Sequence, residues 1–256
     1  MTPEQRSLDI EHSVTIAARR ETVFRYFTDS ERFAAWWGKG STIEPRPGGS
    51  VHIRFPGDVV AGGEVIEIAP PERIVFSYGF ESGKPIPIGA SRVTVTLEET
   101  AGGTLVKLRH ELPNADVRDE HVQGWRYQLA VFANVVAKEA HAGAAALADR
   151  FFGCWRETDL ARRRDELAAI AVPELSFRDP YSCTSGIDDL NAHIAAAQRF
   201  MPGVVLERQG DARSCQGLAL VDWSVNGPDG NPRARGTNVF ELAKDGRIAR
   251  VTGVWV

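Results

Sequence analysis

The chain of 256 residues has little of what marks secreted, membrane-spanning or metal-binding proteins. Its three cysteines, Cys154, Cys183 and Cys215, show no paired spacing, so neither a disulfide framework nor a CxxC site is expected. No run of about 18 to 20 apolar residues occurs, which argues against a membrane-spanning helix. The polar, acidic start MTPEQRSLDIEHS lacks the basic end and apolar stretch of a signal peptide. We therefore expect a cytoplasmic protein that does not bind a membrane.

An excess of positive charge is also missing. The 30 basic and 34 acidic residues give a net charge of −4, so nucleic acid is not expected as a partner. The six histidines form neither an HExxH motif nor a close His/Cys cluster, so we expect no metal and no cofactor. These absences favour a protein that binds or converts a small molecule.

The composition is that of a fully folded protein, with 43% hydrophobic and 25% charged residues. Because domains centre on about 100 to 150 residues, the length favours two of them. A change of pattern after the alanine-rich stretch 141–146 predicts a first domain over residues 1–141 and a second over 144–256.

The first half follows the order strand, helices, strands, helix. Alternation of apolar and polar residues predicts a strand over 10–16, and helical spacing predicts two short helices between residues 20 and 37. Up to six short strands, separated by Gly and Pro turns, are predicted between Thr42 and Leu112. A long helix is predicted over about 116–140, with one apolar stripe that must pack on the sheet. The fold class is therefore α+β.

Residues 10–140 resemble the START-like (SRPBCC) superfamily, and within it the homologues of the activator of the heat-shock-protein-90 ATPase. The residues that carry this resemblance are Val23-Phe24, Trp36-Trp37-Gly38, Pro70-Pro71-Glu72-Arg73-Ile74 and Gly124-Trp125. The resemblance implies a helix-grip fold: an antiparallel sheet, a long C-terminal helix and a cavity between them. It brings no catalytic motif.

Strand parity and the helix stripe predict which side chains would line this first cavity as a ligand-binding site. They are the aromatic residues Trp36, Phe55, Phe76, Tyr78, Phe80, Trp125 and Phe132, together with His110 and His121. The alternative is that the aromatic residues are ordinary core and that each histidine is a core residue with a satisfied hydrogen bond.

The second half begins with helices and continues with strands. Apolar spacing predicts helices over 144–158 and 160–170, the second ended by Pro173, then a strand over 175–181 and a helix introduced by Gly186. Later strands are predicted over 204–209, 218–225, 237–242 and 248–256.

Residues 144–256 resemble the SnoaL-like, nuclear-transport-factor-like cone fold, a cone-shaped α+β domain. The resemblance is carried by Phe177-Arg178-Asp179-Pro180, Gly186, Asp222-Trp223, Gly236-Thr237-Asn238, and Asp245-Gly246-Arg247-Ile248 through Trp255. The superfamily includes ketosteroid isomerases, polyketide cyclases and epoxide hydrolases, besides ligand-binding and structural members. Fold alone does not assign an activity.

Parity places several polar side chains on the apolar face of this second sheet. We predict Asp179 as a general base, because a carboxylate in an apolar pocket has a raised pKa, with His193 as its hydrogen-bond partner. Tyr181 and Asn238 would polarise a substrate carbonyl. The expected ligand-binding side chains are Phe177, Trp223, Phe240 and Trp255. The alternative is that Asp179 merely caps the turn at Pro180.

Three functions remain open at this point. The first is binding of a small hydrophobic or polyketide-like molecule in one or both cavities. The second is an isomerase, cyclase or hydrolase activity in the second domain that uses Asp179. The third is regulation of a chaperone ATPase through the first domain. Relatives of the cone fold dimerise through the outer face of the sheet, so a homodimer through the second domain is also expected.

Overall fold

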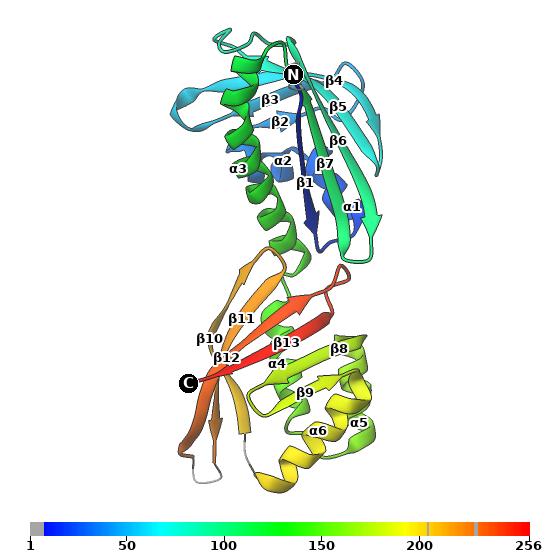
Figure 1. The fold of residues 1–256 in the computed structure, drawn as a ribbon, viewed down its shortest axis with the longest axis vertical. Coiled ribbons are helices and arrows are strands. Elements are labelled where there is room, and N and C mark those ends of the chain that lie inside the picture. Colours follow the sequence, from blue (N-terminus) through cyan, green and yellow to red (C-terminus); the bar gives the residue numbers. More distant parts are fainter. Residues whose placement is uncertain (1–7, 204, 228–229) are drawn as a thin grey trace, which may run out of the picture. The chain divides into compact units, whose positions relative to one another are not determined.

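The computed structural model describes residues 8–203, 205–227 and 230–256 (Figure 1). The chain forms two compact units, Met1–Val136 and Ala137–Val256. The predicted division into 1–141 and 144–256 stays a prediction, and the first residue of the strand predicted over 204–209 lies outside the described residues. Among the described residues, no helix has the length and apolar character needed to span a bilayer.

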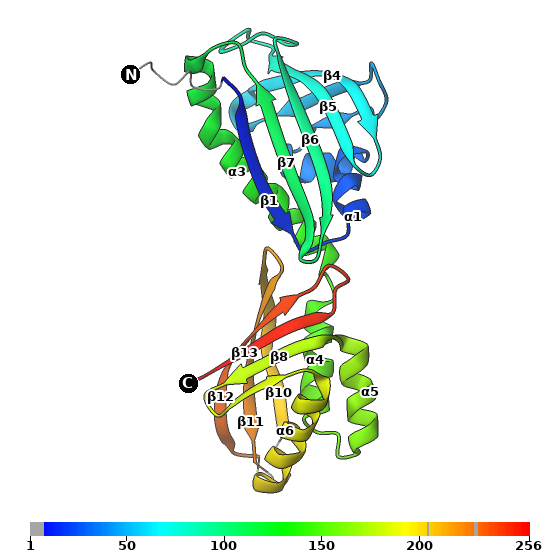
Figure 2. The same ribbon diagram turned by 45° about the vertical axis from the view of Figure 1, so that its right-hand side comes forward.

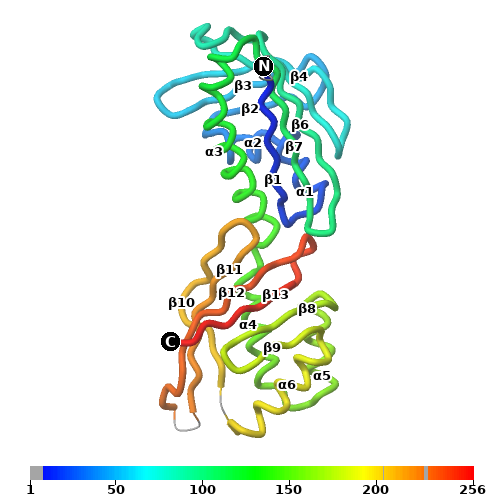
Figure 3. Tube along the Cα trace, in the orientation of Figure 1, coloured from blue at the N-terminus to red at the C-terminus, as the bar shows by residue number. Residues whose placement is uncertain are grey.

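The first unit has the predicted α+β order. In sequence it contains β1 (Ile10–Ile16), α1 (Arg20–Phe24), the 3-10 helix η1 (Arg25–Phe27), α2 (Ser30–Trp37), β2 (Thr42–Ile43), β3 (Ser50–Arg54), the 3-10 helix η2 (Pro56–Asp58), β4 (Val60–Ala69), β5 (Arg73–Phe80), β6 (Ser91–Thr100), β7 (Gly103–Glu111) and α3 (Ala115–Ala140). All neighbouring strands pair antiparallel, in the order β1-β7-β6-β5-β4-β3-β2. The hairpin of β6 and β7 is easily followed in the trace (Figure 3).

Helix α3 runs along one face of this sheet (Figure 2). Its buried side chains repeat at helical spacing, as the apolar stripe in the sequence predicts: Val117, Trp125, Leu129, Phe132 and Val136. The facing sheet residues are buried at alternate positions, as in Val93, Val95 and Leu97 of β6.

The second unit places three helices on one face of a six-stranded sheet (Figure 1). Its elements are α4 (Ala144–Cys154), α5 (Leu160–Ile170), β8 (Ala171–Asp179), β9 (Ser182–Ser185), α6 (Ile187–Phe200), β10 (Val205–Cys215), β11 (Leu218–Asn226), β12 (Pro232–Leu242) and β13 (Ile248–Trp255). The strand order is β10-β11-β12-β13-β8-β9. Only the β13–β8 pair is parallel; the other described pairs are antiparallel.

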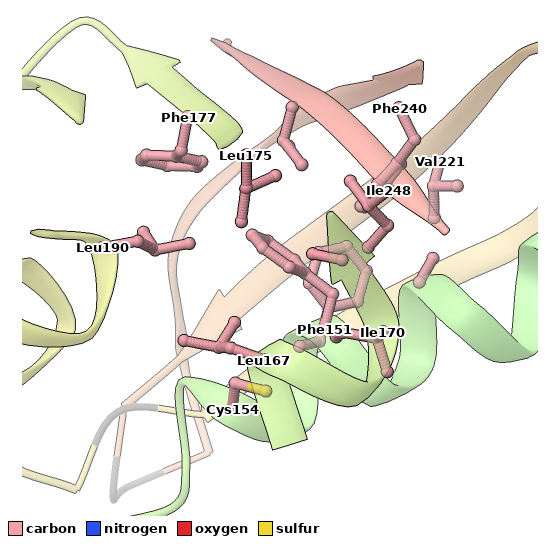
Figure 4. Close-up of a cluster of buried hydrophobic side chains, with 14 of the residues drawn as sticks. Phe151, Cys154, Leu167, Ile170, Leu175, Phe177, Leu190, Val221, Phe240 and Ile248 are labelled. Carbon is pink, nitrogen blue, oxygen red and sulfur yellow. The ribbon is translucent and has the colours of Figure 1, made fainter. Parts of the chain in front are cut away.

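Apolar side chains from the helices and from alternate strand positions form the core of this unit (Figure 4). Phe151 of α4 packs edge-on against Phe240 of β12, with ring centroids 5.5 Å apart. Leu167 of α5 and Leu190 of α6 are fully buried beside them. This core fills one part of the space between helices and sheet.

Two local predictions differ from the structure. Helix α5 covers the predicted residues 160–170, but Pro173, which was expected to end it, lies inside β8. There the pairing of β8 with β13 is irregular between Ala171 and Ser176, so a residue without an N–H is tolerated. The edge strand β9 and the continuation of β10 to Cys215 carry too little hydrophobic alternation to be predicted.

Candidate functional site

The second unit contains a cavity of about 400 Å³ between its helices and the inner face of its sheet. This volume is within the range of small-molecule sites, and the lining is mostly apolar. The side chains and backbone that line it are Trp155, Phe177, Asp179, Tyr181, His193, Ala197, Gln198, Met201, Leu206, Trp223, Val225, Asn238, Gly253 and Trp255.

The four predicted catalytic residues, Asp179, Tyr181, His193 and Asn238, all border this one cavity. The predicted ligand-binding residues Phe177, Trp223 and Trp255 border it as well. Phe240 does not belong to the described lining. It is 1% exposed and packs against Phe151 and Phe152 in the core.

Gly253 lies between Asp179 and Asn238, the two polar side chains that strands contribute to the cavity. It lies on β13, where it pairs with Asn238 of β12, and a Cβ added to it would stand 3.1 Å from Asn238 Oδ1 and 3.2 Å from Asp179 Cβ. Asp179 and Asn238 therefore flank the same glycine. Any side chain at residue 253 would take up space that the cavity now has.

Asp179 ends β8, half-buried, and its carboxylate is held by the turn that follows. Oδ1 accepts the backbone N–H of Tyr181 at 2.9 Å and the hydroxyl of Ser182 at 2.8 Å. Asp179 therefore caps a turn, as the alternative interpretation stated, and it also borders the cavity. Oδ2 makes no bond within the described chain and is left for another donor.

Asn238 is 4% exposed, and its amide has a defined orientation. Its Oδ1 accepts the indole N–H of Trp223 at 2.9 Å. An indole nitrogen can only donate, so the amide oxygen must face Trp223 and the NH₂ group must face elsewhere. Among the described residues nothing accepts from that NH₂ group, which makes it a donor for a ligand.

In the part of the chain that the structure describes, His193 forms no hydrogen bond with Asp179, its predicted partner. His193 packs instead against two rings of the cavity wall, Trp155 at 5.9 Å and Phe177 at 6.1 Å between centroids. The two residues come from different layers, a helix and a strand, and their separation depends on how the layers pack. Strand parity gives no information about that distance.

The predicted position of Tyr181 inside the cavity needs a correction too. Tyr181 lies in the turn after β8 and is 77% exposed, so it borders the mouth rather than the interior. Its ring meets Trp255 edge-on at 5.0 Å and 80°, and Trp255 meets Trp223 at 5.2 Å and 78°. The ring of Trp255 thus meets two other rings at steep angles, and all three residues border the cavity.

Several lining residues were not predicted: Trp155, Ala197, Gln198, Met201, Leu206, Val225 and Gly253. Gly253 was within reach, because parity places it between Val251 and Trp255 on the inner face. Trp155 sits in the apolar stripe of the helix before it, a signal that does not distinguish a cavity wall from core. Its indole N–H is buried and has no partner in the described part of the chain.

A buried arginine, Arg163, connects helix α6 with the segment that follows α4, and both contribute residues to the cavity. Arg163 is 0% exposed and donates to Asn191 Oδ1 at 2.6 Å, to the Glu157 carbonyl at 2.6 Å and to Gln198 Oε1 at 2.9 Å. Gln198 then donates to the Trp155 carbonyl at 2.9 Å. All these acceptors are uncharged, and burial lowers the pKa of the guanidinium. Arg163 thereby fixes α6 and the end of α4 to each other.

The aromatic residues predicted as a ligand site in the first unit contact one another closely. Trp36 lies 4.7 Å from Phe132, and Trp37 lies 5.5 Å from Trp125, between ring centroids. Phe76 is fully buried, Tyr78 is almost so, and Phe55 and Phe80 are half-buried with rings 6.4 Å apart. That these side chains bind a ligand stays a prediction.

His110 is a core histidine whose hydrogen bonds are satisfied. Trp125 Nε1 donates to His110 Nδ1 at 2.8 Å, so Nδ1 carries no proton. Ser91 Oγ donates to the Tyr78 carbonyl and lies 2.8 Å from His110 Nε2, so Nε2–H donates to Ser91. Burial, with the neighbouring His121, lowers the pKa of His110 to about 3. The ring is therefore neutral.

His121 is half-buried on α3. Its Nδ1 lies 2.7 Å from the Val117 carbonyl, which can only accept, so Nδ1 carries the proton. Nε2 is buried and has no partner in the described residues. Burial also raises the pKa of Tyr78, whose ring is 6.1 Å from that of His121.

A larger cleft of about 650 Å³ lies on the outer face of the first sheet. It is lined by charged residues that pair with each other, such as Arg73 with Glu67 at 3.0 Å. It lacks the apolar enclosure of the cavity in the second unit. Within the described chain, no three His, Cys, Asp or Glu side chains gather as a metal site would require.

Comparison with known families agrees with the resemblances predicted for each half. Residues 17–137 match the family model described as activator of Hsp90 ATPase homolog 1-like protein, and residues 148–251 match the SnoaL-like domain. The chain thus carries these two domains in the predicted order. No curated protein matches the chain.

Two solved structures are among those to which this chain is similar. A putative isomerase of the SnoaL-like family from Agrobacterium tumefaciens is 27% identical over 46% of this chain and 98% of its own, with a TM-score of 0.43. The Aha1 dimer from Colwellia psychrerythraea is 18% identical over 47% of this chain and 90% of its own, with a TM-score of 0.42.

Proposed function

We propose that the protein binds a small, largely apolar molecule in the cavity of its second domain. The observation that carries this proposal is the cavity of about 400 Å³, in which aromatic walls surround three polar side chains, Asp179, His193 and Asn238. Apolar walls supply affinity by desolvation, and a few placed polar groups supply orientation. Asn238 offers a donor and Asp179 Oδ2 an acceptor.

The test is a binding titration of the full chain with 2-naphthol, a flat neutral probe, followed by tryptophan fluorescence. We expect saturable binding. Gly253→Ala should weaken it, because the added methyl group would stand about 3 Å from Asn238 and Asp179. Gly153→Ala is the matched control, since its Cβ meets nothing within 4 Å. Absence of saturable binding, or equal effects of both substitutions, would refute the proposal.

A second candidate function is proton transfer within the same cavity. It is favoured by the carboxylate of Asp179, whose Oδ1 is fixed by two donors while Oδ2 has no partner in the described chain. A held carboxylate can take a proton from a bound carbon acid, as a general base does. Asp179→Asn should then abolish turnover of any substrate found for the wild type. Turnover that persists in this variant would exclude the role.

We also propose a homodimer through the outer face of the second sheet. Leu218 on this face is 40% exposed, whereas Asp222 is already paired with Arg213 at 3.0 Å and with the Thr237 hydroxyl. Light scattering at micromolar concentration should give twice 28.1 kDa. A monomer would contradict this assembly. Chaperone regulation through the first domain stays a prediction, which an ATPase assay with a purified chaperone would test.

A further inference from the structure

The cavity of the second domain has an unbalanced charge. Among the described lining residues, Asp179 is the one carboxylate, and none is a lysine or an arginine. The two groups that bond to Asp179 are the Tyr181 N–H and the Ser182 hydroxyl, both uncharged. A half-buried carboxylate without a cation leaves a negative potential in an apolar space.

The buried cation Arg163 bonds to uncharged acceptors rather than to Asp179. Arg163 donates to Asn191, to the Glu157 carbonyl and to Gln198 Oε1, so the Gln198 amide stands between it and the cavity. His193 packs on Trp155 and Phe177 and forms no hydrogen bond with Asp179 in the described chain.

The aromatic rings that border the cavity also favour a positively charged group. Tyr181, Trp255 and Trp223 meet at 80° and 78° with centroids 5.0 and 5.2 Å apart, and all three border the cavity. The face of an aromatic ring carries negative charge density and attracts a cation within about 6 Å of its centroid. Rings at steep angles present both faces and edges, as the walls of an aromatic cage do.

These observations concern different parts of the site but favour the same ligand. We propose that the cavity selects a molecule whose apolar body carries a positively charged nitrogen, a quaternary ammonium or a protonated tertiary amine. Asp179 is its counter-ion, and the rings of Tyr181, Trp223 and Trp255 surround the cationic group. This inference rests on the proposed function, because it requires that the cavity bind a small molecule.

The test compares two probes of the same shape, phenyltrimethylammonium and its neutral counterpart tert-butylbenzene, by fluorescence titration of the full chain. Wild type should bind the ammonium about tenfold more tightly or more, since a cation–π contact and a counter-ion act on the charged probe alone. Asp179→Asn should remove this preference, because it should weaken binding of the ammonium probe far more than binding of the neutral probe. Asn keeps an oxygen for Tyr181 and Ser182, so the turn is retained.

Two further variants separate charge from packing. Asp222→Asn, which removes the same charge from the outer face of the sheet, should keep the preference. Trp255→Leu should weaken the ammonium severalfold more than the neutral probe. Equal binding of both probes by wild type would overturn the inference while leaving the proposed function intact. Binding of neither probe, nor of 2-naphthol, would overturn both.

Discussion

The indole N–H of Trp223 donates to Asn238 Oδ1 at 2.9 Å, and both side chains are only 4% exposed. This bond joins neighbouring strands β11 and β12 and decides which end of the amide meets the cavity. A buried donor or acceptor that loses its partner costs about 1 to 3 kcal/mol. The pair is therefore important both for stability and for the polarity of the site.

The Trp223–Asn238 bond can be measured with a double-mutant cycle. Trp223→Phe and Asn238→Leu should each lower the free energy of unfolding, because each leaves a buried polar atom unpaired. The double variant should lose about 1 kcal/mol less than the sum of the single losses. Chemical denaturation gives all four values. Strict additivity would mean that the bond contributes nothing.

His110 should make the protein acid-sensitive. Its pKa is about 3 in the folded state and 6.5 ordinarily, so below pH 6.5 the unfolded chain takes up a proton that the folded chain refuses. The stability that neutral His110 contributes is therefore present above pH 6.5 and lost as pH falls toward 3. The slope from this group is at most about 1.4 kcal/mol per pH unit.

The variant His110→Gln isolates this effect, because its amide can accept from Trp125 and donate to Ser91. Unfolding free energies measured between pH 7 and 4 should fall less steeply in His110→Gln than in wild type. His52→Gln on β3, which removes a histidine outside the Trp125–His110–Ser91 hydrogen bonds, provides the control. If His110→Gln kept the full slope, the protonation would belong to other groups.

Asp179 should show a clear difference between two substitutions. Asp179→Ala removes the acceptor of both the Tyr181 N–H and the Ser182 hydroxyl, and it should lower the free energy of unfolding by about 1 to 2 kcal/mol. Asp179→Asn keeps Oδ1 and should stay close to wild type. Thermal melts of the two variants test this. Equal destabilisation would show that the charge, rather than the turn, matters for stability.

Arg163 should be the most sensitive position behind the cavity. Arg163→Met leaves the acceptors on Asn191, Glu157 and Gln198 without their donor, and it should cost about 2 to 4 kcal/mol. Arg163→Lys should retain only part of this unfolding free energy, because one ammonium cannot replace the separate donors of the guanidinium. Denaturant unfolding measures both. A neutral Arg163→Met would mean that this network contributes no stability.

The sequence was sufficient to predict one face of the site. Because side chains alternate along a strand, the sequence alone places five site residues on the inner face: Phe177, Asp179, Trp223, Asn238 and Trp255. Parity does not show whether an inner-face side chain borders the cavity or packs against the helices. Phe240 is on the predicted face but belongs to the packed core. It also gives no distances between layers, and the predicted His193–Asp179 bond failed for that reason.

Helical residues and the first domain show the same limit. An apolar stripe predicts that Trp155 is buried, but a core and a cavity wall produce the same stripe. In the first domain, burial of Trp36 and Phe132 followed from the pattern. Whether their rings leave space for a ligand depends on packing at the scale of a methyl group, which one sequence does not specify.

The tryptophans offer the most direct test of where a ligand binds. Of the six, Trp155, Trp223 and Trp255 border the cavity of the second domain, and Trp36, Trp37 and Trp125 lie in the core of the first. Indole N–H signals in a ¹⁵N–¹H spectrum report on each separately. On addition of 2-naphthol, the signals of Trp155, Trp223 and Trp255 should shift and the other three should not. Shifts confined to the first domain, or none at all, would contradict the assignment of the site.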